Sequence, residues 1–460
     1  MATNLQCISP VDGTVYAERP ALTADAARAT AASARRAQPA WSARPLEERI
    51  EFVLAGVARI GAQNDDIVPE LAWQMGRPVR YGGEWGGFNE RSDHMAGIAA
   101  AALRDIEVED SSRFRRLIRR EPRGLVLVVA PWNYPYMTAI NTVAPALIAG
   151  NAVVLKHATQ TLLVGERLAN AFHAAGVPED VFQHLFLKHD TTLTLIRERA
   201  FDFVNFTGSV RGGRAIEDAA AGTFTSLGLE LGGKDTGYVT EDADLEAAVA
   251  TLMGGAMYNF GQCCCGIERT YVHASRYEAF VDGTVAFAEA YKLGNPLEPD
   301  TTLGPMAHRR FAAEARAQVE EAVLAGATAH VRAFPEDDGG TYLSPQVLTD
   351  VDHSTRIMRD ETFAPVVGIM KVAGDDEALA LMNDSDFGLP TSLWTTDAER
   401  AEALGHRVET GTAFMNRADY LDPALCWTGC KLTGKGGGLS EIGYHNLTRP
   451  KSFHLKKVAG

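Results

Sequence analysis

The sequence of 460 residues has no long apolar segment, no excess of positive charge and few cysteines. No stretch reaches the roughly 18 to 20 apolar residues of a membrane-spanning helix. The N-terminal MATNLQCISP also lacks the basic start and the apolar core of a secretory signal. The formal net charge is -15 and the acidic residues are dispersed, which disfavours binding to nucleic acid or to an anionic membrane. We therefore expect a cytoplasmic protein that binds neither.

The six cysteines do not follow the spacing of a metal site. Zinc ligands are separated, as in CxxC or HxxxH, so that four can converge. The cysteines at 263–265 are consecutive, and we expect them to point in different directions. Cys7, Cys426 and Cys430 add no metal spacing. We predict free thiols, as in a reducing cytoplasm, and no metal site.

The consecutive cysteines instead suggest a reactive thiol. They lie in GQCCCGIER, 261–269, directly after a Gly-Gln pair. A thiol is a useful nucleophile only as the thiolate, and backbone donors beside a flexible glycine lower its pKa. A buried cysteine is also commonly a small hydrophobic residue. This run alone therefore leaves a catalytic and a structural role both open.

The length and the hydrophobic content of 46% predict two or three domains with large cores. Residues 23–41 and 46–62 have helical periodicity. From residue 125 onward, short β-branched runs alternate with helical segments, which is typical of a parallel, doubly wound sheet. The expected strands are 125–130, 152–156, 182–187 and 203–206, and the expected helices between them are 138–149, 162–175 and 192–199.

A second alternating stretch follows the cysteines. Its expected helices are 276–291 and 308–325, and its expected strands are 366–372 and 391–394. The sequence therefore predicts an α/β fold with two doubly wound lobes. Two basic segments, 112–120 and 451–457, lie outside this pattern and look strand-like. Because the chain is acidic, we expect solvated or intersubunit strands there rather than a nucleic-acid site.

Three turns next to predicted strands carry polar groups. In FTGSVRGGRAI, 206–216, a strand ends where a helix begins, so backbone N–H groups could face a phosphate. In LELGGK, 229–234, a carboxylate precedes two glycines. In APWNYP, 130–135, Asn133 could donate a hydrogen bond to an oxyanion. Taken alone, each turn has a simpler explanation: glycine for a positive φ in the first, a solvated or paired glutamate in the second, and an asparagine that forms a turn in the third.

Taken together, PWNYP, FTGS, LELGGK, GQCCC and ETFAPV occur in an order and spacing that closely resemble the aldehyde dehydrogenase superfamily. The resemblance extends over almost the whole chain, including GNAVVLK, CWTGCKLTGKG and the closing KSFHLKK. It implies a variant Rossmann cofactor domain, a catalytic domain and a small β oligomerisation arm. A variant cofactor fold also explains why no GxGxxG motif precedes the first strand.

The resemblance also implies domain boundaries and an assembly. The NAD(P)-binding domain would comprise 1–103 and 123–232, and the catalytic domain 233–432. The bridging or oligomerisation segments would be 104–122 and 433–460. Strands in these last segments would extend the sheet of a neighbouring subunit, which gives a homodimer or a homotetramer.

In that family the middle cysteine of the run is the nucleophile. The resemblance therefore implies that Cys264 attacks an aldehyde carbon, and that Asn133 and the Cys264 main-chain N–H form the oxyanion hole. After hydride transfer to NAD or NADP, Glu230 would activate the water that releases the carboxylic acid. These residue types suit their roles, because a thiolate is a good nucleophile and leaving group and a desolvated carboxylate is a base near neutral pH.

Nine residues would contact the cofactor by the same resemblance: Trp132, Lys156, Thr159, Gly208, Ser209, Leu231, Gly232, Glu361 and Phe363. Lys156 would hold the adenosine ribose and Glu361 the nicotinamide ribose. Thr159 stands where NAD-selective relatives often have glutamate, and its neutral hydroxyl does not repel a 2′-phosphate. We therefore expect NAD, with NADP as an open alternative.

Other positions depart from the family pattern. His157 stands where proline is common, and it could meet a phosphate or be a packed surface histidine. Gly436, Gly437 and Gly438 replace a Gly-Arg-Glu motif, and Thr142 stands at the place of its lysine partner. One ion pair of the family is therefore absent, and no proton relay through it is expected.

Seven residues are expected to line the substrate pocket by alignment: Tyr134, Met137, Asn141, Tyr258, Cys263, Cys265 and Trp427. Their aromatic rings could attract the cation of an amino or betaine-type aldehyde. Because Asn141 replaces a further aromatic, an uncharged aliphatic or aromatic aldehyde is preferred. No arginine in these segments awaits a distal carboxylate, although Arg417 lies in a nearby loop, so a succinate-semialdehyde-like substrate also stays open.

Two other functions are less favoured. A CoA-dependent acylating enzyme would often lack the base, whereas Glu230 is present and argues for water as the acceptor. A catalytically silent structural relative would not need Cys264, Glu230 and Asn133 together. We therefore predict an aldehyde dehydrogenase.

Overall fold

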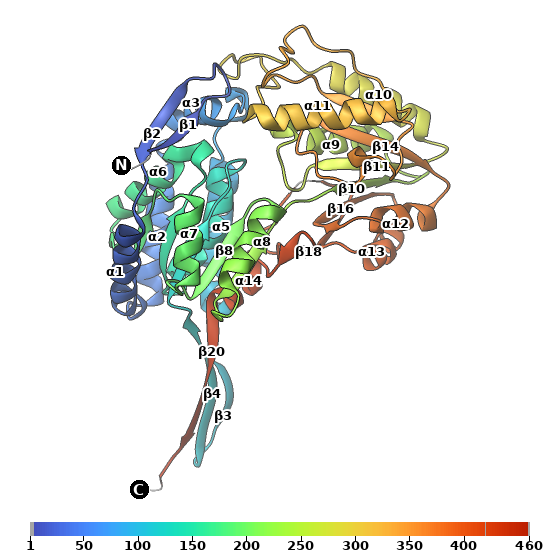
Figure 1. Ribbon diagram of the computed structural model, residues 1–460. Helices are drawn as coiled ribbons and strands as arrows, with labels where there is room; N and C mark the ends of the chain where they lie inside the picture. Colours follow the sequence, from blue (N-terminus) through green and yellow to red (C-terminus); the bar gives the residue numbers. More distant parts are fainter. Residues whose placement is uncertain (1–3, 419, 459–460) are drawn as a thin grey trace.

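Two largely parallel sheets, each with helices on both faces, form the two lobes of the protein (Figure 1). The computed structural model describes residues 4–418 and 420–458. The fold class predicted from the sequence is confirmed. None of the helices within these ranges combines the length and hydropathy that a membrane span requires.

The first sheet has the strand order β19-β9-β8-β5-β6-β7. Its strands are β5 (Leu125–Val129), β6 (Ala152–Lys156), β7 (Phe182–His184), β8 (Phe203–Thr207), β9 (Ser226–Glu230) and β19 (Gly434–Lys435). All neighbours are parallel except β19 and β9. The chain moves outward in opposite directions from β5, so the carboxyl ends of β5 and β8 flank a switch point, where α/β sheets bind ligands.

Helices cover both faces of this sheet. One face carries α2 (Leu46–Gly61), α4 (Trp85–Ala102), α5 (Pro135–Ile148), α6 (Leu162–Ala174) and α14 (Ser440–Leu447), with α3 (Asn64–Met75) packed beside them. The other face carries α1 (Ala24–Ser42), α7 (His189–Arg197) and α8 (Val210–Ala220). The hairpin of β1 (Asn4–Ile8) and β2 (Val15–Pro20) precedes them. Strands β5 and β6 are aliphatic except for Lys156 and fully buried because both faces are covered.

The second sheet has the order β12-β13-β14-β11-β10-β16-β17. Its strands are β10 (Asp235–Val239), β11 (Ile267–His273), β12 (Thr328–Ala329), β13 (Gln346–Thr349), β14 (Val366–Val372), β16 (Pro390–Trp394) and β17 (Thr412–Met415). One face packs on α9 (Leu245–Met257) and α10 (Tyr277–Glu289). The other packs on α11 (Arg309–Leu324), α12 (Asp375–Asn383) and α13 (Ala398–Arg407).

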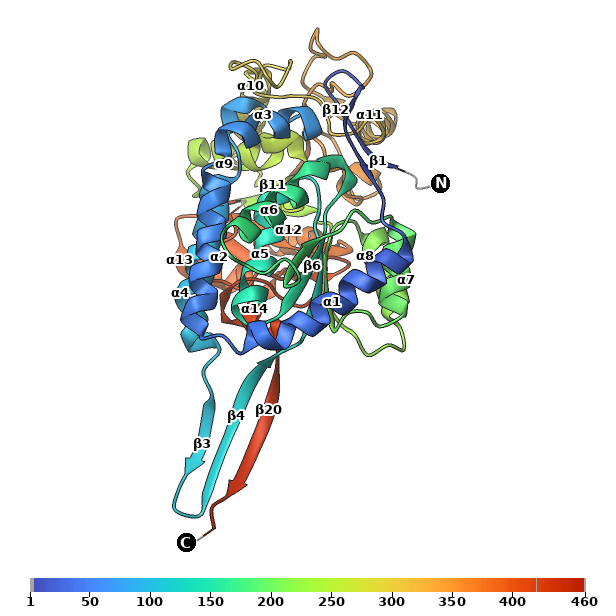
Figure 2. The same cartoon turned by 90° about the vertical axis from the view of Figure 1, so that its left-hand side faces the viewer.

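A three-stranded antiparallel arm projects from the first lobe (Figures 1 and 2). It consists of β3 (Ile106–Asp110), β4 (Phe114–Pro122) and β20 (Thr448–Lys456), in the order β20-β4-β3. Strand β20 pairs with β4 along its whole length, from Thr448 opposite Pro122 to Lys456 opposite Phe114. Both basic segments of the sequence are thus strands of one arm. Its intersubunit role and the domain boundaries remain predictions.

Most element bounds agree with the sequence pattern to within two residues, and four differ by three residues. Helix α7 begins at His189 rather than at 192, and β20 begins at Thr448 rather than at 451. Helix α5 begins at Pro135 rather than at 138, because the Glu84 carboxylate accepts hydrogen bonds from the Tyr136 and Met137 N–H groups in its first turn. The strand expected at 182–187 ends at His184, and beyond it only the Leu185 N–H still donates to β6.

Candidate active site

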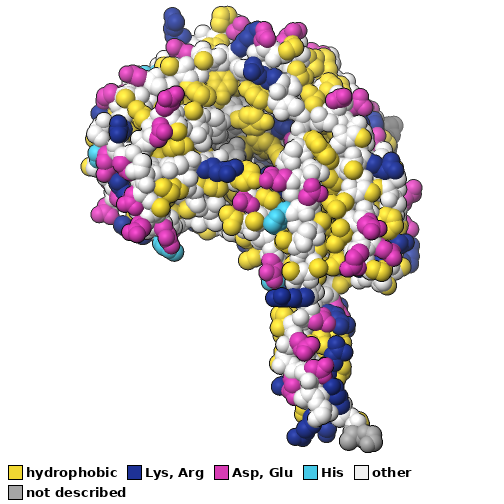
Figure 3. Space-filling model, turned by 180° about the vertical axis from the view of Figure 1, so that it is seen from behind, with side chains coloured by type: hydrophobic (Ala, Val, Ile, Leu, Met, Phe, Trp, Pro, Cys, Tyr) yellow, Lys and Arg dark blue, Asp and Glu magenta, His cyan; other side chains and the backbone are white. Residues whose placement is uncertain are grey.

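A cavity of about 510 Å³ opens where the carboxyl ends of β5, β8 and β9 face the second lobe. Figure 3 shows the molecule from behind, where the surface is hollowed between the lobes. Asn133, Glu230 and Cys264 all line this cavity, although they belong to three separate segments. The structure therefore brings together the three residues that the family resemblance marks as catalytic.

The cysteine run is held in an irregular backbone by close packing. It follows the short helix η3 (Tyr258–Gly261), in which Asn259 and Phe260 adopt left-handed φ angles of 50° and 64°. Gly261 also has a positive φ of 65°, and a Cβ there would lie 2.2 Å from the Ala364 carbonyl oxygen. Only glycine avoids both penalties, so the glycine at the start of the run is a structural requirement.

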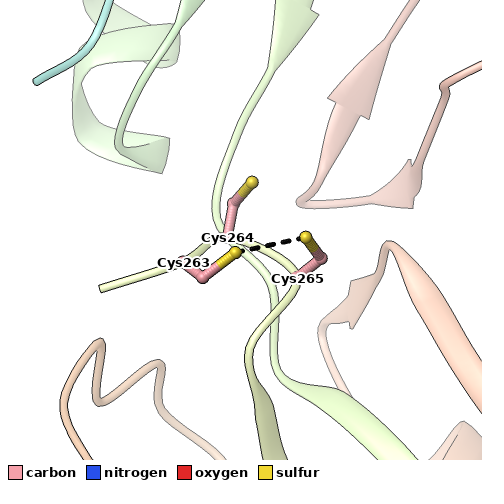
Figure 4. Close-up of side chains that lie close together, drawn as sticks. All are labelled: Cys263, Cys264 and Cys265. Atoms are coloured by element: carbon pink, nitrogen blue, oxygen red, sulfur yellow. Dashed lines mark hydrogen bonds between the residues drawn. The ribbon is translucent and has the colours of Figure 1, made fainter. Parts of the chain in front are cut away.

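The three thiols differ in orientation (Figure 4). Cys263 Sγ and Cys265 Sγ face each other at 3.2 Å, and the Cys264 side chain leaves the backbone in another direction. All three sulfur atoms nevertheless lie within 4.8 Å of one another. The expectation that the three side chains point in different directions is therefore wrong for the sulfur atoms, which converge. Hydrogen bonding by Cys263, then by Cys265, lowers the pKa of the Cys264 thiol against the opposing effect of burial.

Glu230 is the last residue of β9 and faces the cavity. Its Oε2 accepts a hydrogen bond of 3.1 Å from the Thr207 hydroxyl. Burial raises the pKa of Glu230 to about 7, although Thr207 and the charge of Arg91 act in the opposite direction. A carboxylate with this pKa can exchange a proton near neutral pH.

The two glycines after Glu230 allow close approach of other groups. A Cβ at Gly232 would lie 2.5 Å from Glu361 Oε2, and one at Gly233 would lie 2.1 Å from the Cys264 carbonyl oxygen. The Gly233 N–H donates to Glu361 Oε1 at 3.0 Å. Residues of LELGGK thus fix both the carboxylate of Glu361 and the backbone of the cysteine run.

Asn133 is positioned by a buried ion pair that the sequence patterns did not reveal. Asn133 Nδ2 donates to the Gln262 carbonyl at 3.1 Å, and the Asn133 carbonyl accepts from Arg77 Nη2 at 2.7 Å. Arg77 Nη1 lies 2.7 Å from Glu84 Oε1, with side chains only 2% and 1% exposed. Arg77 Nε also donates to Asn259 Oδ1 at 3.1 Å. No motif marks Arg77 or Glu84, so only their burial identifies them.

The other side of the cavity has the features of a dinucleotide site. Trp132 stacks on Phe311 at a centroid distance of 5.4 Å and meets Phe363 edge-on at 5.7 Å. Ser209 caps α8, its Oγ accepting from the Gly212 N–H at 3.2 Å. Gly208, Ser209, Leu231, Gly232 and Glu361 also line the cavity. A helix N-terminus and an aromatic wall are suited to a diphosphate and a planar ring.

Lys156 and Thr159 are not brought to this cavity. Lys156 ends β6, on the far side of β5 from the switch point, and burial lowers its pKa to about 8. Thr159 begins the short helix η2 (Thr159–Thr161) and is partly exposed. Both lie where the more distant end of an extended cofactor could reach them.

His157 is packed in the interior rather than at the surface. Its Nε2 lies 3.1 Å from the Pro135 carbonyl and its Nδ1 lies 3.2 Å from the Thr161 hydroxyl. Burial lowers the pKa of His157 to about 4. Because both ring nitrogens already have partners and the ring stays neutral, the suggestion that it meets a phosphate is not supported.

The substrate side of the cavity contains five of the seven expected residues: Tyr134, Met137, Tyr258, Cys263 and Cys265. The structure does not bring Asn141 and Trp427 to the wall. Trp427 packs in the core and pairs with Gly438 through two backbone hydrogen bonds. Asn141 lies on α5 and accepts a hydrogen bond from Arg91.

Arg91 of α4 lines the cavity and was not predicted. Its helix carries no motif, and only a charged residue on a face of small apolar residues could have drawn attention to it. Tyr420 lines the cavity as well, with Arg417 stacked on its ring at 3.7 Å. Arg417 itself is exposed and outside the lining.

A nucleophilic thiol, an amide donor and a carboxylate of raised pKa beside a dinucleotide site are typical of an oxidoreductase that forms a covalent cysteine intermediate. A sequence profile of the aldehyde dehydrogenase family matches residues 1–453. The chain belongs to this family, as the sequence motifs predicted, and it is an NAD(P)-dependent oxidoreductase that acts on aldehydes.

Named relatives show the same family. A succinate-semialdehyde dehydrogenase [NADP(+)] of Mycolicibacterium paratuberculosis is 31% identical over 454 residues, with 97% of this chain and 96% of that protein covered. An NADP-dependent glyceraldehyde-3-phosphate dehydrogenase of Bacillus halodurans, solved with NADP, is 30% identical with a TM-score of 0.93, covering 99% and 96%. A succinic semialdehyde dehydrogenase of Streptococcus pyogenes with NADP+ is 27% identical with a TM-score of 0.93, covering 98% and 100%.

The ion pair that positions Asn133 yields a test of stability. Replacing Glu84 by glutamine leaves the Arg77 charge buried without its counter-ion, so we expect the free energy of unfolding to fall by about 3–5 kcal/mol. Urea unfolding followed by circular dichroism measures this. The control is Glu166→Gln, which breaks the Arg19–Glu166 pair whose side chains are each 35% exposed, and which should cost at most about 1 kcal/mol. An equal loss of unfolding free energy in both variants would show that the buried pair contributes no more to stability than the exposed one.

Proposed function

We propose that Cys264 is the nucleophile, Asn133 an oxyanion donor and Glu230 the deacylation base in the oxidation of an aldehyde to a carboxylic acid. The observation that carries this proposal is their convergence in one cavity, where the pKa of the thiol is lowered and that of the carboxyl is raised. Opposite shifts of this kind match a nucleophile and a base that both act near neutral pH.

The first step forms a bond between Cys264 Sγ and the aldehyde carbon. The carbonyl oxygen becomes an oxyanion, which Asn133 Nδ2 can stabilise with the hydrogen that it does not donate to Gln262. Among the described residues, no backbone acceptor is found for the Cys264 N–H, which leaves it as a second donor. The buried Arg77–Glu84 pair keeps the Asn133 backbone in place, so the donors are oriented before the substrate arrives.

The second step converts the thioester to the acid. Held by Trp132, Phe363 and Glu361, a nicotinamide would supply the hydride acceptor for the oxidation of the thiohemiacetal, so that an acyl group would remain on Cys264. Glu230 then takes a proton from a water molecule, the water oxygen bonds to the acyl carbon, and the Cys264 thiolate leaves. The Thr207 hydroxyl orients the carboxylate for this transfer.

The residues present fit a dinucleotide. The free N–H groups at the start of α8, with Gly208 and Ser209, would hold its diphosphate. The ring wall of Trp132 and Phe363 and the carboxylate of Glu361 would hold its nicotinamide half. Lys156 and Thr159 would hold the adenosine ribose, and the neutral Thr159 accepts a 2′-phosphate without charge repulsion. The names of the relatives support the use of NADP.

The remaining proposals concern substrate, assembly and location. The relatives named as succinate-semialdehyde dehydrogenases favour the semialdehyde alternative over an uncharged or an amino aldehyde. The long exposed edges of the arm support a homodimer or a homotetramer in which the arm pairs with a neighbouring sheet. The half-buried and buried free thiols are consistent with the reducing cytoplasm.

The proposed function is tested with a panel of aldehydes and with both NAD and NADP, followed by the absorbance of the reduced cofactor. The wild type should turn over at least one aldehyde, and Cys264→Ala should lower kcat by at least about 10⁴-fold because the nucleophile is lost. The matched variants Cys263→Ala and Cys265→Ala should mainly change substrate preference. A similar loss in all three variants would contradict the assignment of Cys264.

The role of Glu230 predicts a pH dependence. Glu230 is protonated below its pKa of about 7 and cannot accept a proton there. Steady-state turnover should therefore fall below about pH 7, while the rapid first hydride transfer persists. Glu230→Gln should show the same burst with slow turnover at every pH, measured by stopped flow. Loss of the burst in this variant would assign Glu230 another role.

Cofactor choice is tested at Thr159. Replacement by glutamate places a negative charge where a 2′-phosphate would lie, so the KM for NADP should rise by about tenfold or more, or about 1.4 kcal/mol. The KM for NAD should change much less. Thr159→Gln, similar in size but neutral, is the control and should retain NADP. If both variants behave alike, Thr159 does not contact the 2′-position.

A further inference from the structure

Arg91 is a buried cation on the wall of the substrate side of the cavity. Its side chain belongs to α4, the residue is 8% exposed, and its surroundings are formed by α4, α5 and the cysteine run. Burial lowers the pKa of Arg91, although the charges of Glu84, Cys265, Glu90 and Glu230 act in the opposite direction. An arginine remains charged in proteins, so this site holds a positive charge in a poorly hydrated environment.

The hydrogen bonds of Arg91 are few and long. Only Nη1 donates, to the Met137 carbonyl and to Asn141 Oδ1, both at 3.3 Å. Across residues 4–418 and 420–458, no acceptor is found for Nε or Nη2, and no carboxylate lies within ion-pair distance. Buried charges are normally paired with an opposite charge. The cation of Arg91 therefore has unused donors on a cavity wall.

The other buried arginines of the described chain are better satisfied. Arg77 pairs with Glu84 and has two further acceptors. Arg49 donates to three backbone carbonyls, and Arg269 to the Lys234 carbonyl, the Tyr271 hydroxyl and the Leu381 carbonyl. None of these three lines the cavity. Arg91 has unused donors and lines the cavity, which points to a partner that enters the cavity.

We propose that Arg91 binds the distal carboxylate of a short aldehyde substrate and selects for that charge. The proposal rests on the proposed function, since the aldehyde end must reach Cys264. A guanidinium offers two parallel donors to a carboxylate, which gives geometric as well as electrostatic selectivity. Cys264 and Arg91 line the same cavity, which must also admit the nicotinamide end of the cofactor, so the space left for the acyl chain is limited.

Two other charged groups lie near the cavity mouth. Glu90 is exposed and accepts a hydrogen bond from the Tyr420 hydroxyl. Arg417 is exposed and stacked on Tyr420, outside the lining. Neither is buried, so solvent screens both, whereas the charge of Arg91 acts in a desolvated site and should dominate selectivity.

The test compares succinate semialdehyde with 4-methylpentanal, a neutral aldehyde in which an isopropyl group replaces the carboxylate. The wild type should prefer the semialdehyde in kcat/KM. Arg91→Gln should lower kcat/KM for the semialdehyde by about 10- to 100-fold, mainly through KM, because a hydrogen bond to a charged group is lost. The loss for 4-methylpentanal should be at most about threefold. Arg91→Lys should recover part of the loss, and Arg417→Gln, the control, should change neither substrate.

A second variant leaves Arg91 in place. Asn141→Asp puts a carboxylate on the atom that already lies 3.3 Å from Arg91 Nη1. This internal partner should neutralise the site, so preference for the semialdehyde should fall by about tenfold or more while 4-methylpentanal is still oxidised. Circular dichroism checks that both variants fold.

Several results would overturn the proposal. Equal losses for both aldehydes in Arg91→Gln would show that Arg91 acts through Glu230 or the fold. Unchanged semialdehyde oxidation in both variants would place the carboxylate elsewhere. A wild-type preference for 4-methylpentanal or for 4-aminobutanal would exclude an anion-selective site. The proposed function fails separately, and the inference with it, if the wild type oxidises no aldehyde of the wider panel with either cofactor. Oxidation of other panel aldehydes without succinate semialdehyde would overturn the inference alone.

Discussion

The buried ion pair of Arg77 and Glu84 is the interaction on which the geometry of the site depends. Glu84 holds the first turn of α5, and Arg77 reaches the Asn133 carbonyl and the Asn259 side chain beside the cysteine run. One pair therefore connects the turn after β5 in the first lobe with the loop of the second lobe that carries Cys264. Because the charges are desolvated, the pair is worth little as net stability but strongly disfavours any other arrangement of these segments.

A second buried pair has the same effect on the cofactor side. Lys234 Nζ donates to Glu268, whose carboxylate also accepts from the backbone N–H groups of Thr362 and Phe363. These contacts fix the segment that presents Glu361 and the Phe363 ring to the cavity, with Phe363 at a positive φ of 54°. Such a backbone is held by its surroundings rather than by its own preference.

Burial sets the pKa values of the groups in the cavity, and at Cys264 hydrogen bonds from neighbouring side chains outweigh its effect. Burial raises the pKa of Glu230 to about 7 and that of Glu361 to about 8. The Cys264 thiol is shifted the other way, because neighbouring thiols stabilise its thiolate. Such burial disfavours a further negative charge in the cavity, and Arg91 is a buried cation on its wall whose charge acts to lower the pKa of Glu230. The charge of a substrate bound in this cavity would therefore influence the pKa of the Glu230 carboxyl.

Much of the fold was predictable from the sequence, because short runs of neighbouring residues carry the pattern of strands and the family motifs. The aliphatic runs fix buried strands such as β5 and β14, and the motifs at strand ends identify the family together with Cys264, Glu230 and Asn133. Glycines 232, 233 and 261 stand where another backbone or carboxylate approaches, so their positions in the motifs are physical requirements.

Other properties were decided only by the tertiary structure. No local pattern shows that His157 is buried with both nitrogens satisfied, that Asn141 and Trp427 lie behind the cavity wall, or that Arg91 faces the cavity. The rotation of α4 on α5 and the docking of the two lobes determine these environments, and both are set by contacts between residues far apart in the chain. The sequence therefore determined the family and supplied the candidate reactive groups, whereas packing between distant segments decided which charges are buried beside them.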